Sequence, residues 1–136
     1  MPFFPSREWM EAYCGHLSAH AGFDTLASRM EGVYRFVVEP SGPLTDRHGY
    51  DVKVQPGDDL EAACAQLLAE PAPSPTLAMT ATYERWRQLI VGELDIGMAV
   101  MSRRLKVSGD LTRLLSRLES ASPLIDSLRQ VETEWA

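Results

Sequence analysis

The amino-acid sequence predicts a mixed α/β (α+β) fold, because helical periodicity and strand alternation both occur in one short chain. Tyr83, Trp86 and Ile90 recur at helical spacing. Residues 105–108 alternate apolar with polar side chains, as a half-buried strand does. Residues 33–38 form a run of β-branched and aromatic side chains, which is typical of a strand. Elements of both kinds must therefore pack into one core.

The length and composition are those of one globular domain. The chain has 136 residues, of which 45% are hydrophobic and 24% charged, as in an ordinary soluble protein. No run approaches the roughly 18 apolar residues that a membrane-spanning helix needs. The N-terminus lacks the basic and apolar parts of a secretory signal. Cys14 and Cys64 are too few for a disulfide framework and indicate reduced thiols. We therefore expect one cytoplasmic domain over residues 1–136.

The first half of the chain predicts two helices followed by two strands. Ser6 is a suitable N-cap for a first helix, whose apolar face carries Trp9, Tyr13 and Leu17. The next elements are expected in this order: a short helix at about 23–30 ended by Gly32, a strand at 33–38, and a strand at 51–54.

The second half is punctuated by capping residues. Thr82 is a suitable N-cap for a helix that Gly92 ends, and Asp95 can cap a second, short helix. A strand follows at 105–108, and Gly109 ends it. Asp110 is then expected to cap a third helix, whose apolar face is Leu111, Leu114, Leu115 and Leu118.

The chain is expected to end in a helix. Ser122 has the type of an N-cap residue and Pro123 would occupy the first helical position. The apolar side chains that follow recur at i, i+4, i+7 and i+11: Leu124, Leu128, Val131 and Trp135. This helix either completes the core or covers the mouth of a cavity and moves.

Four pieces of the second half resemble the sterol carrier protein type two (SCP-2) family. They are Tyr83-x-x-Trp86, Gly92-Glu93-Leu94-Asp95, the methionine-rich turn 98–101, and the segment 104–111 with the pattern Arg-Leu-Lys-Val-x-Gly-Asp-Leu. The resemblance implies a curved, mostly antiparallel five-stranded sheet. Helices would cover one side of this sheet, with a lipid-sized hydrophobic tunnel between the two layers.

Residues 60–70 are ambiguous between helix and strand. They are good helix formers with an apolar stripe, so their local pattern favours a helix. The family topology requires a strand at this place, which leads through a proline-rich turn at 71–75 into a strand at 76–81. We expect a strand at 62–68, because tertiary context often overrides propensity.

The apolar side chains of the predicted elements admit two interpretations. They would form an ordinary core in any small α/β protein, whereas the resemblance makes them candidates for the lining of a lipid tunnel. A methionine thioether is flexible and suits a cavity for varied chains. Burying one methylene contributes about 0.8 kcal/mol, so a chain of ten or more methylenes could reach about micromolar affinity. The candidate lining residues are Phe36, Val38, Met79, Trp86, Ile90, Met98, Met101, Val107, Leu111, Leu114 and Leu128.

Positive charge is concentrated in residues 103–117, although the net charge of the chain is −6. The negative total argues against a general nucleic-acid binder, which needs lysine and arginine on its surface. The basic cluster is either a solvated face or a contact for anionic lipid headgroups or for a ligand's carboxylate or phosphate. The candidate headgroup residues are Arg103, Arg104 and Lys106.

No motif in the sequence carries catalysis or metal binding. His16 and His20 are spaced i, i+4, but no acid completes a metal motif, so we expect solvated histidines, no metal and no cofactor. The chain has no Gly-rich phosphate loop and no serine nucleophile elbow, so no catalytic residue is assigned.

The function that the resemblance implies is non-catalytic binding and transfer of a hydrophobic ligand such as a fatty acid, acyl-CoA, isoprenoid or sterol. The expected partners are this small molecule, a transient anionic membrane surface and a partner enzyme. Two alternatives remain open. One is an enzyme that acts on a hydrophobic substrate with His48 or Asp51 at the cavity mouth. The other is an accessory module with a filled core that works through a partner enzyme.

Overall fold

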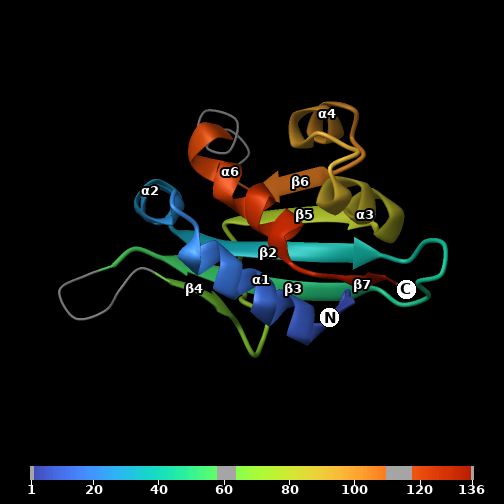
Figure 1. Cartoon of the computed structure of the whole chain (residues 1–136), viewed down its shortest axis with the longest axis horizontal. Coiled ribbons are helices and arrows are strands. Elements are labelled where there is room, and N and C mark those ends of the chain that lie inside the picture. The colour runs from blue at the N-terminus through green and yellow to red at the C-terminus, as the bar shows by residue number, and fades with distance from the viewer. Residues whose placement is uncertain (1, 58–63, 110–117, 136) are drawn as a thin grey trace.

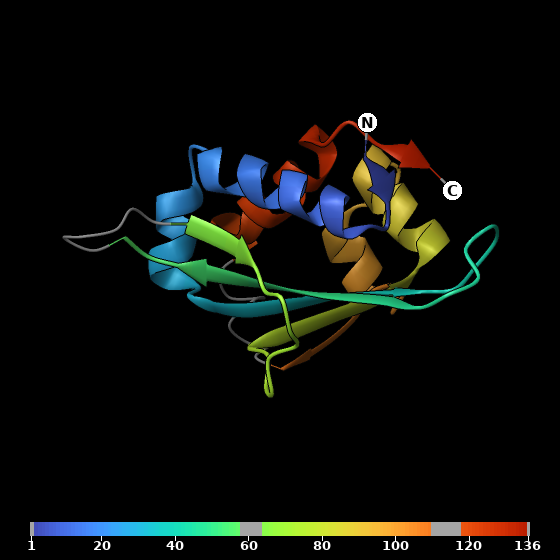
Figure 2. The ribbon, with the colours of Figure 1, turned by 90° about the horizontal axis from the view of Figure 1, so that it is seen from below.

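The chain folds into two layers, a sheet and a set of helices that lie on one of its faces (Figures 1 and 2). The computed structural model describes residues 2–57, 64–109 and 118–135. The predicted α+β fold with a five-stranded, mostly antiparallel sheet is confirmed. This arrangement follows from the strand sequences, because each strand turns one apolar face toward the helices.

The strand order of the main sheet is β4-β3-β2-β5-β6. β2 and β5 run parallel, and the other neighbouring pairs run antiparallel. Phe36 lies opposite Tyr50 on one side and Met79 on the other, so these three side chains share the face toward the helices. The strands are β2 (Gly32–Glu39), β3 (His48–Gln55), β4 (Cys64–Leu67), β5 (Leu77–Thr82) and β6 (Lys106–Gly109).

The helices begin where the capping residues predict. The side chains of Ser6, Thr82 and Asp95 accept hydrogen bonds from backbone N–H groups in the first turns of α1, α3 and α4. Gly92 ends α3 in the left-handed conformation, with a φ of 86°. The helical elements are α1 (Arg7–Ala19), α2 (Phe23–Arg29), α3 (Tyr83–Val91), α4 (Ile96–Met101), α6 (Leu118–Asp126) and the 3₁₀-helix η1 (Ser127–Gln130).

Residues 64–67 form a strand. The family topology predicted this strand, whereas local propensity favoured a helix. β4 pairs with β3, and the backbone N–H of Ala65 also donates to the side-chain oxygen of Ser18 on α1 at 3.0 Å. These contacts satisfy backbone groups that a helix would have satisfied internally. Residues 62 and 63 of the predicted strand lie outside the described part of the chain.

The prediction of a final helix that starts at Ser122 is wrong. Helix α6 begins at Leu118 and contains Pro123 in its interior. Pro123 is buried, and its ring lies beside Gly22, whose lack of a side chain leaves room for it. This packing outweighs the usual preference of proline for the first position of a helix. The predicted cap at Asp110 lies outside the described residues.

The chain also does not end in a helix. After η1 the backbone becomes extended, and strand β7 (Glu134–Trp135) pairs in parallel with strand β1 (Phe3–Phe4). Trp135 packs edge-on against Phe4, with ring centroids 5.6 Å apart, and against Tyr83 at 6.3 Å. The predicted apolar stripe is therefore largely inward-facing, with Leu124, Leu128 and Val131 buried and Trp135 half-buried, although the backbone that carries it changes from helix to strand.

Aromatic side chains fill the core between α1 and the sheet. Trp9 stacks on Tyr13 with centroids 6.0 Å apart, and Tyr13 meets Phe36 edge-on at 5.5 Å. The indole N–H of Trp86 donates to the carbonyl of Val37 at 2.8 Å, which satisfies its polar atom inside the core. This part of the interlayer space is consequently occupied by the protein's own side chains.

Candidate functional site

An apolar pocket of about 310 Å³ lies between α4, α6 and the β5–β6 end of the sheet. Its volume is at the lower end of the range of small-molecule sites. α4 and α6 supply apolar walls from one layer, and the sheet and the segment before β6 supply the other. The apolar lining residues are Met79, Ile96, Leu105, Leu124 and Ile125.

Polar side chains line the rest of this pocket. Asp95 is the N-cap of α4, and its carboxylate accepts from the backbone N–H of Met98 at 3.1 Å. The carboxylate of Asp126 lies 3.2 Å from Nε2 of His20, and Nε of Arg129 donates to the carbonyl of Leu89 at 3.2 Å. The Asp126–His20 contact therefore ties α6 to the end of α1, and the Arg129–Leu89 bond ties η1 to α3, whereas Asp95 caps only α4.

The predicted lining residues are only partly found at this pocket. Met79 lines it. Four others surround a void of only about 10 Å³ in the aromatic core, which is at most the space of one water molecule. Ile90 is buried in the core, and Val107 is partly buried and packs against the core. The four residues around the small void are Phe36, Val38, Trp86 and Leu128.

Met98 and Met101 are a correction to the sequence prediction. Their side chains are 60% and 82% exposed, so this structure does not place them inside a cavity. The reason is the orientation of α4, which buries Ala99 and half-buries Ile96. Residues three apart lie on one face of a helix, and here that face is turned to solvent. The two remaining candidates, Leu111 and Leu114, lie outside the described residues.

The family model described as the SCP-2 sterol transfer family matches residues 17–120. The chain belongs to this family. A search of curated proteins finds no significant match to the chain. The family assignment supports lipid binding or transfer in general terms.

Solved structures share the fold of this chain. A crystal structure of sterol carrier protein 2 matches with a TM-score of 0.75 at 21% identity, covering 93% of this chain and 98% of that chain. The conserved hypothetical protein TT1886, possibly sterol carrier protein, from Thermus thermophilus matches with a TM-score of 0.74 at 21% identity, over 98% and 92%. The UbiJ-SCP2 ubiquinone synthesis protein matches with a TM-score of 0.51 at 18% identity, over 87% and 90%.

The predicted headgroup residues of this SCP-2 chain lie at a second, polar groove. Arg103, Arg104 and Lys106 are exposed and line a groove of about 370 Å³ together with Arg85. Glu39 is the acid in this groove. Among the described residues, the first three of these bases form no ion pair.

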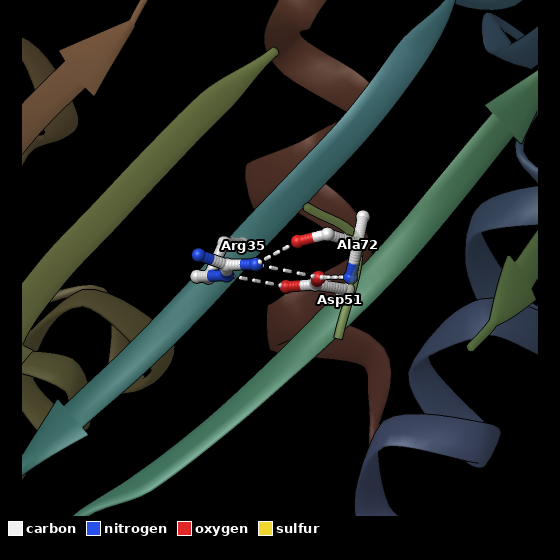
Figure 3. A network of polar contacts seen from close by, with 3 residues as sticks. All are labelled: Arg35, Asp51 and Ala72. Atoms are coloured by element: carbon white, nitrogen blue, oxygen red, sulfur yellow. Dashed lines mark hydrogen bonds and ion pairs between the residues drawn. The ribbon is translucent and has the colours of Figure 1, made fainter. Parts of the chain in front are cut away.

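Asp51 is engaged in a structural network on the sheet face that the helices leave open (Figure 3). Its carboxylate accepts from Nε and Nη2 of Arg35 at 2.8 and 3.0 Å and from the backbone N–H of Ala72 at 2.7 Å. Nη2 of Arg35 also donates to the carbonyl of Ala72 at 2.7 Å. The network fastens the segment between β4 and β5 to the sheet.

The pKa of Asp51 reflects two opposing effects. Burial raises it, whereas the hydrogen bonds from Arg35 and from the Ala72 amide, together with the charge of Arg35, lower it by more. The net pKa is below the ordinary value, so the group is a charged anchor and a poor general base near neutral pH. His48 stacks on Tyr50, with centroids 6.4 Å apart. Neither Asp51 nor His48 lines the apolar pocket.

The described part of the chain contains neither a group of side chains that could hold a metal ion nor a helix that could span a membrane. No three His, Cys, Asp or Glu side chains are grouped there as metal ligands. None of the helices described is long and apolar enough to cross a membrane.

The sequence does not locate the pocket, because its lining residues have the same apolar pattern as core residues. Ile96 and Leu105 are recognisable as apolar positions of their elements, but nothing in the pattern distinguishes a pocket wall from a core position. Ile125 stands beside the stripe of the last helix and outside it, which is the one signal that could have indicated a separate apolar surface. Arg129 and Asp126 belong to no motif.

Proposed function

We propose that this SCP-2 chain binds a hydrophobic molecule in the pocket between α4, α6 and the sheet and carries it without chemical change. The observation that carries the proposal is the apolar pocket of about 310 Å³, walled by Met79, Leu105 and Ile125 among others. Such a function needs no catalytic acid or base, because burial of hydrocarbon supplies the binding energy.

The pocket volume sets the size of the ligand chain. A volume of 310 Å³ holds about ten methylene-sized groups at roughly 30 Å³ each. Burying ten methylenes contributes about 8 kcal/mol at about 0.8 kcal/mol each. Association costs at least about 4 kcal/mol, which leaves at most about 4 kcal/mol, so ten buried methylenes alone give a dissociation constant of about 1 mM or weaker. A longer chain must extend beyond this pocket or widen it.

The polar wall favours a ligand with a neutral polar end. Among the described residues that line the pocket, the carboxylates of Asp95 and Asp126 oppose one guanidinium, that of Arg129. A free carboxylate at this wall meets two like charges, whereas a hydroxyl meets acceptors for its proton. Of the candidate ligands, an isoprenoid alcohol of about ten carbons therefore fits better than a free fatty acid, a sterol would exceed the pocket volume, and an acyl-CoA would keep its charged part outside.

Nuclear magnetic resonance of the methyl groups tests this proposal. Titration with 1-decanol should produce saturable shifts at Met79, Ile96 and Ile125, and decanoate should bind more weakly. The methyl groups of Leu26, which is buried on α2, serve as an internal reference that should not move. The absence of a shift at Ile125 up to the solubility limit of decanol, or shifts as large at Leu26 as at Ile125, would reject the pocket as the binding site.

A second candidate is an accessory module that acts through a partner enzyme. Two observations favour it: the space around Trp86 and Leu128 is a void of only about 10 Å³, and one structure of the same fold is that of a ubiquinone synthesis protein. If no neutral lipid shifts the pocket methyl groups, this candidate replaces the carrier proposal. The enzyme alternative is the less supported one, because Asp51 is held by Arg35.

The setting of the proposed function follows the sequence expectations. We propose one binding domain over residues 1–136 in the cytoplasm, where the two free cysteines remain reduced. Arg103, Arg104 and Lys106 are proposed to contact anionic headgroups when the ligand is exchanged with a membrane.

A further inference from the structure

The exposed methionines of α4 lie beside bases that form no ion pair with any described residue. Met98 and Met101 are among the large apolar side chains with the greatest exposure in the described part of the chain. The exposed Arg103 and Arg104 follow directly, and Lys106 begins β6. Figure 1 shows α4 and β6 together along one edge of the molecule. We call this surface the α4 corner, defined by Met98, Met101, Arg103, Arg104 and Lys106.

The backbone of the α4 corner is tightly held. The N–H of Leu105 donates to the carbonyl of Ala99 at 3.0 Å, and the N–H of Arg103 donates to the carbonyl of Val100 at 3.2 Å. Arg103 has a φ of 59°, a left-handed conformation that a residue with a side chain seldom adopts. These bonds fix the backbone of the turn, so the Cα atoms from which the methionines and the bases project are held close together.

We propose that the α4 corner docks on an anionic lipid bilayer, with Met98 and Met101 inserted among the headgroups and Arg103, Arg104 and Lys106 paired with lipid phosphates. An apolar tip flanked by bases has the chemistry of a membrane interface, since it offers burial and attraction to anionic lipid together. The inference deepens the headgroup contact proposed above for the three bases, because it adds the insertion of the two methionines, and it does not depend on the pocket.

The distribution of charge gives the docking a direction. The acids near α4, Glu93 and Asp95, lie before its first turn, whereas Arg103 and Arg104 follow its last turn. Glu39 also lines the basic groove and is paired with Arg47 at 3.3 Å. The C-terminal end of α4 therefore faces the bilayer, and its acidic end is turned away from it.

The same helix forms a wall of the apolar pocket. Ile96 and Gly97 line the pocket from α4, while Met98 and Met101 project to the solvent. Docking at the α4 corner would bring the pocket close to the hydrocarbon of the bilayer. A lipid could then pass between bilayer and pocket over a short path, and this consequence rests on the proposed function, whereas the docking itself does not.

Flotation with lipid vesicles tests the docking. The chain should float with vesicles of phosphatidylcholine and phosphatidylglycerol at low salt and should float poorly with phosphatidylcholine alone. The variant Arg103→Gln with Arg104→Gln should bind about 25-fold more weakly at low salt, since each cation contributes about fivefold. The variant Met98→Ser with Met101→Ser should bind at least about tenfold more weakly at any salt concentration.

Matched controls separate the α4 corner from the general surface. Phe3→Ser changes another exposed apolar side chain, and Lys53→Gln removes another exposed base on β3, both outside the corner. These variants should float like the original chain. Equal loss in the controls, or no loss in the two corner variants, would overturn the proposal. Absence of flotation with every vesicle composition would overturn it as well and would direct attention to a protein partner.

The depth of insertion provides a second measurement. Met101→Trp places an indole at the most exposed of these apolar positions, and phospholipids brominated in their acyl chains should quench it. Trp9 and Trp86 are buried and Trp135 is half-buried, and the original chain, which contains the same three tryptophans, supplies their background. Quenching no greater than in the original chain would reject insertion. If docking fails while decanol still shifts the pocket methyl groups, only the docking proposal is rejected. If docking is observed and decanol shifts none of these methyl groups, only the carrier function is rejected.

Discussion

Replacing Ile125 by tryptophan should weaken lipid binding with little change in stability. Ile125 is half-buried and lines the apolar pocket from α6. The indole exceeds the isoleucine side chain by about two methylene-sized groups, and the ligand loses that space. At about 0.8 kcal/mol per methylene the loss is about 1.6 kcal/mol, which weakens the affinity about 15-fold.

The assay is a titration of methyl resonances with 1-decanol, combined with urea unfolding of each variant. Val91→Trp is the matched control, because Val91 is 49% exposed and is not among the residues that line the pocket. The control should bind decanol like the original chain. An unchanged affinity in a folded Ile125→Trp variant would refute the argument, and so would an equal loss in Val91→Trp, because neither result is compatible with a ligand inside this pocket.

Three further predictions concern the stability and reactivity of the fold. Asp51→Asn should lower the free energy of unfolding by about 2 kcal/mol at pH 7, because Arg35 loses its charged partner. The pKa of Asp51 is depressed in the fold, so its contribution is present above the ordinary value of about 3.9 and is lost as the pH falls through the folded pKa. The difference between the variants in urea unfolding should therefore shrink in acid, and a constant difference would contradict this. Burial, followed by the charge of Glu11, raises the pKa of Cys14 to about 12. Alkylation of the native chain at pH 8 should therefore modify Cys64 and spare Cys14, as the intact mass would show. Rapid labelling of both cysteines would contradict this prediction. Gly92→Ala should destabilise by about 1 kcal/mol because of its φ of 86°, whereas Gly15→Ala in α1, where a Cβ meets open space, should stabilise slightly. Thermal unfolding of both variants measures the two changes in stability, and changes of the same sign would contradict this prediction.

The local elements could be predicted because their signals are local. Ser6, Thr82 and Asp95 cap their own helices, and Gly92 ends α3 by its own conformation. The strand β4 was different, since its sequence favours a helix and only its pairing with β3 decides the matter. Knowledge of the family topology supplied that long-range information, which the residues themselves do not contain.

The end of the chain and the pocket could not be predicted in this way. Trp135 is in a strand because it meets Phe4, more than a hundred positions earlier in the sequence. The location of the pocket depends on which apolar side chains fill the space between the layers. Trp86 and Phe36 fill it beside α1, and the free space remains near Ile125. A stripe of apolar residues predicts burial and does not indicate where packing leaves a cavity.

The role of the methionines shows the same limit. The spacing of Met98 and Met101 predicts that both lie on one face of α4, and they do. Whether that face meets the sheet or the solvent depends on Ala99 and Leu105, which anchor the opposite side. The network of Asp51 with Arg35 and Ala72 also joins three separate segments, and no pattern along the chain predicts it.

The most direct test of the carrier function is native mass spectrometry of freshly purified chain, followed by extraction and identification of any lipid that accompanies it. The carrier proposal predicts one hydrophobic molecule per chain, with a neutral polar end, and its loss in the Ile125→Trp variant. A mass equal to the chain alone, together with no saturable effect of decanol on the pocket methyl groups, would contradict the carrier function and favour the accessory module.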